Sequence, residues 1–194
     1  MKYSTDRATL RANLKAARAG LSSTFRAACA DKLSQQLITL PSIREATNIA
    51  VYHAIQTEMN LMPFIRACWQ TEKHCYLPVI LPETLKFSRY TEHTPLQKST
   101  WHVPEPICTA EQQYDADSMD VICIPLVGFD AQANRLGQGA GHYDRALAFT
   151  RDAEKKPLLI GIAYECQRVA QLPVEPWDIP MDMVITEERV YDVR

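Results

Sequence analysis

Three of the six glycines in the chain, Gly137, Gly139 and Gly141, occupy alternate positions within five residues. The apolar run 121–127 before them has the composition of a buried strand, and the run 143–149 after them favours a helix. Glycine allows positive φ angles and a close approach of the backbone to a ligand. A loop of this kind that opens onto a helix presents backbone N–H groups to an anion. The sequence therefore predicts an anion-binding turn between a strand and a helix.

Strand-like and helix-like segments alternate along most of the chain. Capping residues and periodicity predict two N-terminal helices, ending near residues 19 and 40, and later helices at 61–70 and from the glycines to about 151. The strand-like runs are 48–53, 74–80, 85–90, 121–127, 157–164 and 183–186. This order predicts a three-layer α/β fold, with a central, mostly parallel sheet flanked by helices and an N-terminal helical pair. No repeat or linker divides the sequence, so we expect residues 1–194 to form a single domain.

Charge and composition disfavour several classes of protein. The net charge is −2, whereas a general nucleic-acid-binding protein is expected to be basic. No apolar run approaches the ~18 residues of a membrane-spanning helix, and the N-terminus lacks the apolar core of a signal peptide. The six cysteines form no C-x-x-C pair and mostly lie in apolar runs, which favours reduced thiols over disulfides. We therefore expect a cytoplasmic monomer that binds neither nucleic acid nor membrane.

The glycine run differs from two common phosphate-binding motifs. It lacks the Lys-Ser or Lys-Thr pair of a Walker A loop, and its spacing is not G-x-G-x-x-G. However, Arg135 and Arg145 bracket the run, and Asp144 stands at the start of the next helix. A tight turn with solvated arginines is the plain structural interpretation. The two cations and the acid favour phosphate binding with an associated metal.

Basic residues recur along one face of the first predicted helix. Arg7, Arg11, Lys15 and Arg18 are spaced by four, four and three residues, which places them on one face. A solvated face is the commoner interpretation of such a stripe. The functional interpretation is that the helix lends one or two cations to an anionic ligand, with Arg7 and Arg11 one turn apart.

Three residues in loops are further candidates. Glu58 follows the strand-like run 48–53, where its carboxylate would meet donor groups of a ligand. Trp101, in a proline-rich loop, could stack on a flat heterocycle or fill the core. Asp178, in a proline-braced segment, could supply an oxygen to a metal. Glu58 and Asp178 could equally be loop or turn acids. The histidines lack metal-ligand spacing and no G-x-S-x-G is present, which disfavours a zinc site and a serine hydrolase.

Taken together and in this order, these segments resemble the 5-formyltetrahydrofolate cyclo-ligase family. The most specific match is R-L-G-Q-G-A-G-H-Y-D-R at 135–145, and the resemblance covers nearly the whole chain. It implies an α/β fold and the use of Mg²⁺ and ATP. The implied reaction is the ATP-dependent cyclisation of 5-formyltetrahydrofolate to 5,10-methenyltetrahydrofolate. ADP and phosphate would be released after phosphorylation of the formyl oxygen.

The resemblance also implies roles for particular residues. The residues expected to bind ATP are Arg7, Arg11, Arg135, Gly137, Gly139, Ala140, Gly141, His142, Tyr143 and Arg145. Those expected to be catalytic are Arg135, Tyr143 and Asp144. Asp144 and Asp178 would hold the metal. The residues expected to face the folate are His53, Glu58 and Trp101.

The sequence departs from the family pattern at several positions. Arg7 stands where Lys is usual, which keeps the charge but changes the donor geometry. The other departures are Ala133 for Gly, Ala140 for Gly or Lys, His142 for an aromatic residue, and Trp177 for His.

Two alternative functions stay open at this point. A sugar-phosphate isomerase or CoA-transferase-like enzyme on a similar scaffold would use the glycine loop for phosphate. It would not need Asp144 and Asp178 to converge on one metal. A non-catalytic folate-binding protein would retain Glu58 and Trp101.

Overall fold

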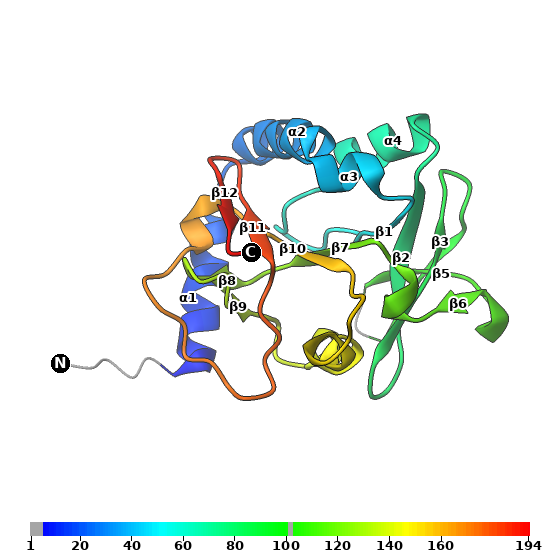
Figure 1. The fold of residues 1–194 in the computed structure, drawn as a ribbon. Helices are drawn as coiled ribbons and strands as arrows, with labels where there is room; N and C mark the ends of the chain where they lie inside the picture. Colours follow the sequence, from blue (N-terminus) through cyan, green and yellow to red (C-terminus); the bar gives the residue numbers. More distant parts are fainter. Residues whose placement is uncertain (1–5, 101–102) are drawn as a thin grey trace.

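The structure is a computed structural model that describes residues 6–100 and 103–194 (Figure 1). Its helices are α1 (Arg7–Ala19), α2 (Ser23–Thr39), α3 (Pro41–Glu45), α4 (Met62–Gln70) and α5 (His142–Ala146). Single 3₁₀ turns lie at Ala110–Gln112, Ala116–Ser118, Ala148–Arg151 and Glu165–Gln167. The strands are β1 (Asn48–Ala50), β2 (His74–Ile80), β3 (Leu85–Tyr90), β4 (Leu96–Lys98), β5 (Pro104–Pro106), β6 (Gln113–Tyr114), β7 (Val121–Pro125), β8 (Gly128–Phe129), β9 (Arg135–Leu136), β10 (Leu158–Ile162), β11 (Met183–Ile185) and β12 (Val190–Asp192).

An eight-stranded sheet forms the centre of the molecule, in the order β12-β11-β10-β7-β1-β2-β3-β6. The strands from β11 to β2 pair in parallel, and β12, β3 and β6 add to the two ends in antiparallel orientation. Parallel strands of this kind are buried on both faces, which explains their nearly continuous apolar runs. The prediction of a mostly parallel central sheet is confirmed.

Helices and loops cover both faces of this sheet, as Figure 1 shows. Side chains alternate along each strand, so Val121 and Cys123 of β7 join one apolar core, whereas Ile122 and Ile124 join the other. The first core contains buried residues of α2, α3 and α4. The second packs against α5 and the chain near Met181. The three-layer α/β architecture predicted from the sequence is therefore present.

Helix α1 packs beside the 3₁₀ turn Glu165–Gln167, which follows β10. The Asp6 carboxylate caps it by accepting from the Thr9 amide at 3.3 Å, which satisfies one of the free N–H groups of the first turn. Leu14 packs with Leu136 and Leu172 in a small separate core. The predicted N-terminal helical pair is present, with α2 in the core of one sheet face and α1 beside the glycine segment.

The sequence suggested that the glycine segment directly follows β7. In the structure it does not. The hairpin β8–β9 intervenes, and the fully buried Asp130 organises it. The Asp130 carboxylate accepts from the backbone amides of Gln132 and Asn134, both at 3.1 Å, and of Leu172 at 3.0 Å. These bonds satisfy a buried charge through chain segments that are distant in sequence.

Two other predicted elements are shorter in the structure than the sequence indicated. β1 ends at Ala50, and the helix expected to reach residue 151 ends at Ala146, after which a 3₁₀ turn continues to Arg151. The six cysteines all lie within the described residues, and none forms a disulfide. No helix in the part of the chain that the structure describes combines the length and apolar character needed to cross a bilayer.

Candidate functional site

A cavity of about 1330 Å³ opens beyond the carboxyl ends of β1, β2 and β7. Pockets for one small molecule usually measure roughly 300–1,000 Å³, so this cavity has room for more than one ligand. Its walls come from the loop after β1, the ends of β2 and β7, the start of α1, the glycine segment, α5 and residues 175–178. The expected position of the site, beyond the strand ends and beside the glycines, matches this cavity.

The glycine loop forms one wall. Gly139 and Gly141 have φ angles of 109° and 70°, which side chains rarely adopt, and Gly141 is the N-cap of α5. Arg11 donates from Nε to the Gly137 carbonyl at 2.8 Å. Arg145 donates from Nη2 to the Ala140 carbonyl at 2.9 Å. The two arginines therefore hold the loop through its carbonyl groups while they line the same cavity.

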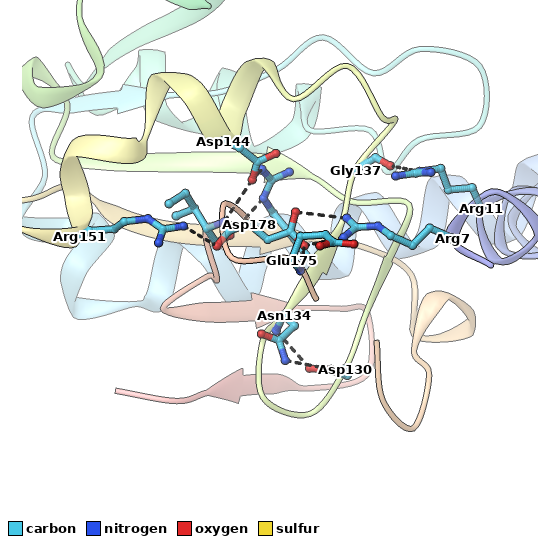
Figure 2. Close-up of polar contacts among 11 residues, drawn as sticks. Arg7, Arg11, Asp130, Asn134, Gly137, Asp144, Arg151, Glu175 and Asp178 are labelled. Atoms are coloured by element: carbon cyan, nitrogen blue, oxygen red, sulfur yellow. Dashed lines mark hydrogen bonds and ion pairs between the residues drawn. The ribbon is translucent and has the colours of Figure 1, made fainter. Parts of the chain in front are cut away.

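Two ion pairs cross this wall (Figure 2). Arg7 binds both oxygens of Asp178, with Nη1–Oδ2 at 2.6 Å and Nη2–Oδ1 at 3.2 Å. Arg135, which is 6% exposed, pairs with Asp144 Oδ1. The backbone of Ile179 joins the second pair, because its amide donates to Asp144 Oδ1 at 3.1 Å and its carbonyl accepts from Arg135 Nε at 3.3 Å. Asp144 and Asp178 therefore lie in one region, but each is paired with an arginine.

The predicted metal ligands fit a magnesium ion that arrives with phosphates. Mg²⁺ keeps several waters and takes one or two carboxylates together with phosphate oxygens. The hydrogen bonds to Asp144 go to Oδ1, so Oδ2 is the more available oxygen, whereas both oxygens of Asp178 accept from Arg7. Among the described residues no group of three or more His, Cys, Asp or Glu could hold a metal. The donor set thus suits a nucleotide-bound Mg²⁺ better than a site made by protein alone.

Glu58 lies on the wall formed by the loop after β1 and is 8% exposed. Its Oε2 accepts from the Ile55 amide at 3.1 Å, and its Oε1 accepts from Gln138 Nε2 at 3.1 Å. Burial raises the pKa of Glu58, and the Ile55 amide, the charge of Arg18 and the Gln138 hydrogen bond oppose that rise. A buried carboxylate with few donors is prepared to accept hydrogen bonds from a ligand.

Two further residues were expected on the folate side. His53 lines the cavity, and its Nδ1 is buried without a hydrogen-bond partner in the part of the chain that the structure describes. An unpartnered buried nitrogen can be satisfied by a bound ligand. Trp101 lies outside the described residues.

The first two side chains of α5, His142 and Tyr143, are uncharged near neutral pH. Burial raises the pKa of the Tyr143 hydroxyl, which therefore stays protonated and can donate a hydrogen bond. Burial and the nearby charge of Arg145 lower the pKa of His142. His142 thus adds no full positive charge to the loop at neutral pH.

Several cavity residues were not singled out as ligand-binding residues from the sequence. Gln138 connects the glycine loop to Glu58 across 80 positions of sequence, and Arg151 donates to the Asp178 carbonyl at 3.2 Å. Trp177 lines the cavity although it is 65% exposed. The tryptophan could have been suspected, because it stands beside Asp178 in a proline-braced segment. The Gln138 contact has no local signal.

Comparisons with known proteins agree on one family. The model of the 5-formyltetrahydrofolate cyclo-ligase family matches residues 3–187. A 5-formyltetrahydrofolate cyclo-ligase of Haemophilus influenzae is 34% identical over 178 residues, which are 90% of this chain and 94% of that protein. The Escherichia coli K12 protein of the same name is 34% identical over 81% of this chain and 87% of its own length.

Solved structures give the same result. The 5,10-methenyltetrahydrofolate synthetase of Aquifex aeolicus superposes with a TM-score of 0.84 at 30% identity and covers 97% of this chain and 93% of its own. The synthetase of Mycoplasma pneumoniae has a TM-score of 0.74 at 25% identity, with 94% and 99% of the two chains covered.

Proposed function

Because the chain belongs to the 5-formyltetrahydrofolate cyclo-ligase family, we infer that it is the ATP-dependent ligase that converts 5-formyltetrahydrofolate to 5,10-methenyltetrahydrofolate. One observation carries this conclusion beyond the family resemblance. A single large cavity has a glycine loop with arginines on one wall and a buried carboxylate on the other. This arrangement suits a phosphate donor facing a heterocyclic acceptor. The isomerase or CoA-transferase alternative does not call for the Glu58 carboxylate, and turnover separates the ligase from a binding protein without activity.

The chemistry explains why such a cavity is needed. The N5-formyl group is amide-like and a poor electrophile. Transfer of the ATP γ-phosphoryl group to the formyl oxygen turns that oxygen into part of a leaving group. N10 then attacks the formyl carbon and gives up its proton, the C–O bond breaks, and phosphate departs with the former formyl oxygen. Phosphoryl transfer depends on in-line positioning and charge neutralisation more than on a protein nucleophile.

We propose that the glycine-loop wall binds the ATP phosphates. The amides of the loop and the guanidinium groups of Arg7, Arg11 and Arg135 are the donors available there. Arg135 is the main catalytic cation in this proposal, because it is held by the Ile179 carbonyl and is nearly buried. A charge that is already fixed in place costs no reorganisation when the transferred group becomes more negative. Tyr143, protonated, would donate a hydrogen bond to a phosphate oxygen.

Asp144 and Asp178 would hold Mg²⁺ together with the phosphates. The bound ion would neutralise phosphate charge and fix the geometry of the transferred group. Asp144 is the more available ligand, since Asp178 must first leave Arg7. Arg145 braces the loop through the Ala140 carbonyl and so would support the phosphates indirectly.

Glu58 and His53 would bind the pterin. A carboxylate matches the paired amino and ring N–H donors of a planar heterocycle. The unpartnered His53 Nδ1 offers one further polar contact. Trp101 is proposed to pack against the pterin or its linker. We also propose that residues 1–194 act as one domain and that the protein is a cytoplasmic monomer.

The test is an absorbance assay for the methenyl product with 5-formyltetrahydrofolate as substrate. Product should form only when ATP and Mg²⁺ are both present, with one ADP and one phosphate released per turnover. Product formation without ATP would contradict the proposed phosphorylation. Binding of the folate without any turnover would instead favour the non-catalytic alternative.

A further inference from the structure

Arg7 and Asp178 form an ion pair inside the cavity, although 171 positions separate them in sequence. The pair is bidentate, and the side chains are 21% and 12% exposed. The hydrogen bond that Arg7 donates to Asp178 raises the pKa of Arg7. Burial acts against ionisation of Asp178, but the bonds from Arg7 and the Glu175 amide hold the pKa of Asp178 below its ordinary value. Both groups are therefore charged across the neutral range.

The partner of Arg7 distinguishes it from the neighbouring arginines. Arg11, Arg145 and Arg151 bind neutral carbonyl groups, at Gly137, Ala140 and Asp178 respectively. Arg7 instead donates to both carboxylate oxygens of Asp178. A guanidinium group binds two phosphate oxygens in the same forked geometry. In Figure 2 the Arg7 side chain extends from α1 toward Asp178 in this way.

The second ion pair of the wall is held more firmly. The Ile179 backbone binds both Arg135 and Asp144, and the Arg135 side chain is only 5% exposed. The Arg7 side chain is about four times as exposed, at 21%. It comes from the first turn of α1 and is thus the ion-paired cation of this wall that can more readily change partner.

We propose that Asp178 occupies the place of a nucleotide phosphate on Arg7 in the free protein, and that bound phosphates displace it. The inference rests on the proposed binding of ATP to this wall. Its consequence is a coupling between ligands. Phosphates that take Arg7 release the Asp178 carboxylate for a cation, so nucleotide and divalent metal each favour the binding of the other.

The test measures binding of ADP and ATP in the presence of EDTA by calorimetry. Asp178→Asn removes the competing charge while its amide oxygen can still accept from the Glu175 amide, which now lies at 2.8 Å from Oδ2. The variant should bind metal-free nucleotide more tightly by about 5-fold, as expected for loss of one partly exposed ion pair. With Mg²⁺ in excess that advantage should disappear, because a metal ligand has been removed.

Glu175→Gln is the matched control. Glu175 lines the same wall three residues away and acts on Arg7 by charge, but among the described residues it forms no ion pair with Arg7. Glu175→Gln should change the affinity for metal-free ADP and ATP by less than about 2-fold, since unpaired surface charges are screened. In an Arg7→Met background, Asp178→Asn should give no tightening, because the cation for which the two anions compete is gone.

Unchanged or weaker metal-free binding by folded Asp178→Asn would overturn the exchange, as would equal tightening by Glu175→Gln. Thermal unfolding identifies a folded variant, and Asp178→Ser replaces Asn if the latter does not fold. Failure of the unaltered protein to bind ADP or ATP under any condition would overturn the proposed function as well. Binding that does not respond to Asp178→Asn would overturn the exchange alone.

Discussion

On one wall of the cavity acids face arginines, in the pairs Arg7–Asp178 and Arg135–Asp144. On the other wall the carboxylate of Glu58 meets a backbone amide and the neutral side chain of Gln138. The first wall thus balances charge with charge, and in our proposal a phosphate replaces Asp178 on Arg7. The second wall holds the buried Glu58 carboxylate with few hydrogen-bond donors around it. A ligand rich in N–H groups can supply the missing donors.

The contrast indicates why one cavity can hold two different substrates. A highly charged anion on the Glu58 wall would meet a carboxylate whose neighbouring cation, Arg18, is buried and bonded to Thr57. A neutral heterocycle on the arginine wall would leave two ion pairs undisturbed and gain little. In our proposal this difference in charge compensation separates the two ligands, and the Gln138–Glu58 hydrogen bond joins the two walls.

The largest effect is expected at Arg135. Arg135→Ala should lower kcat/KM for ATP by about 100-fold, because a charge-assisted contact of ~3 kcal/mol is lost. Steady-state kinetics with varied ATP measure this, with the KM for 5-formyltetrahydrofolate as the internal control. Unchanged ATP kinetics in the folded variant would remove Arg135 from the phosphate wall.

Glu58→Gln tests the other wall. It keeps the size of the side chain but removes its charge, and it should weaken binding of 5-formyltetrahydrofolate by roughly 1.5–3 kcal/mol. Affinity for ATP should hardly change. Separate calorimetric titrations of the two ligands provide the measurement. A loss of ATP affinity with intact folate binding would place Glu58 on the nucleotide side and reverse the comparison.

A smaller effect is expected on the Mg²⁺ dependence of the reaction when Asp144 is changed. Asp144→Asn should lower activity and raise the Mg²⁺ concentration for half-maximal rate by about 10-fold, a loss typical of a weakened metal site. Varying Mg²⁺ at fixed ATP measures the shift. A nucleotide-bound structure in which Asp144 and Asp178 point to separate places would refute their shared ion but not the phosphate role of the glycine loop.

The smallest effects concern stability, and they should have opposite signs on the two walls. The folded state raises the pKa of Glu58 above its ordinary value of 4.5 through burial, so the contribution of Glu58 to stability is present at acid pH and is lost as pH rises through the folded pKa. At neutral pH, Glu58→Gln should therefore unfold at a higher temperature than the unaltered protein. This advantage should shrink below about pH 4.5.

Asp178 should behave in the opposite way. Its pKa is lowered below its ordinary value of 3.8, so its contribution is present above that pH and is lost as pH falls through the folded pKa. Asp178→Asn should thus cost stability at neutral pH, by less than about 1 kcal/mol for a partly exposed pair. Thermal unfolding of both variants from pH 3 to about 8 checks the two signs. Equal signs would mean that the walls do not differ in how they hold charge.

Local chemistry allowed much of the fold to be predicted. Asp6 and Ser22 cap α1 and α2 within the segments that the sequence indicated, because capping depends on neighbouring residues. Apolar periodicity gave the order of β1, α4, β2, β3, β7, β10 and β11, but it missed α3, β4, β5, β6 and β12. The hairpin β8–β9 was missed, since its two-residue strands are shorter than any periodic signal and depend on Asp130 and the distant Leu172.

The candidate site was predictable only in part for the same reason. The glycines could be identified because Gly139 and Gly141 require positive φ angles. Ala133 is a related case, since its φ of 56° lies in the region that favours glycine. The partners of the charges could not be read from the sequence. Arg7 meets Asp178, and Gln138 meets Glu58, only because the fold brings distant segments together.

The central claim is that the two walls bring the ATP γ-phosphoryl group to the formyl oxygen of the folate. Turnover of 5-formyltetrahydrofolate labelled with ¹⁸O in the formyl group tests it directly, with mass analysis of the inorganic phosphate. We expect one ¹⁸O atom in phosphate for each methenyl product formed. Methenyl product with the label released into water would contradict it, because the formyl oxygen would then have left without being phosphorylated.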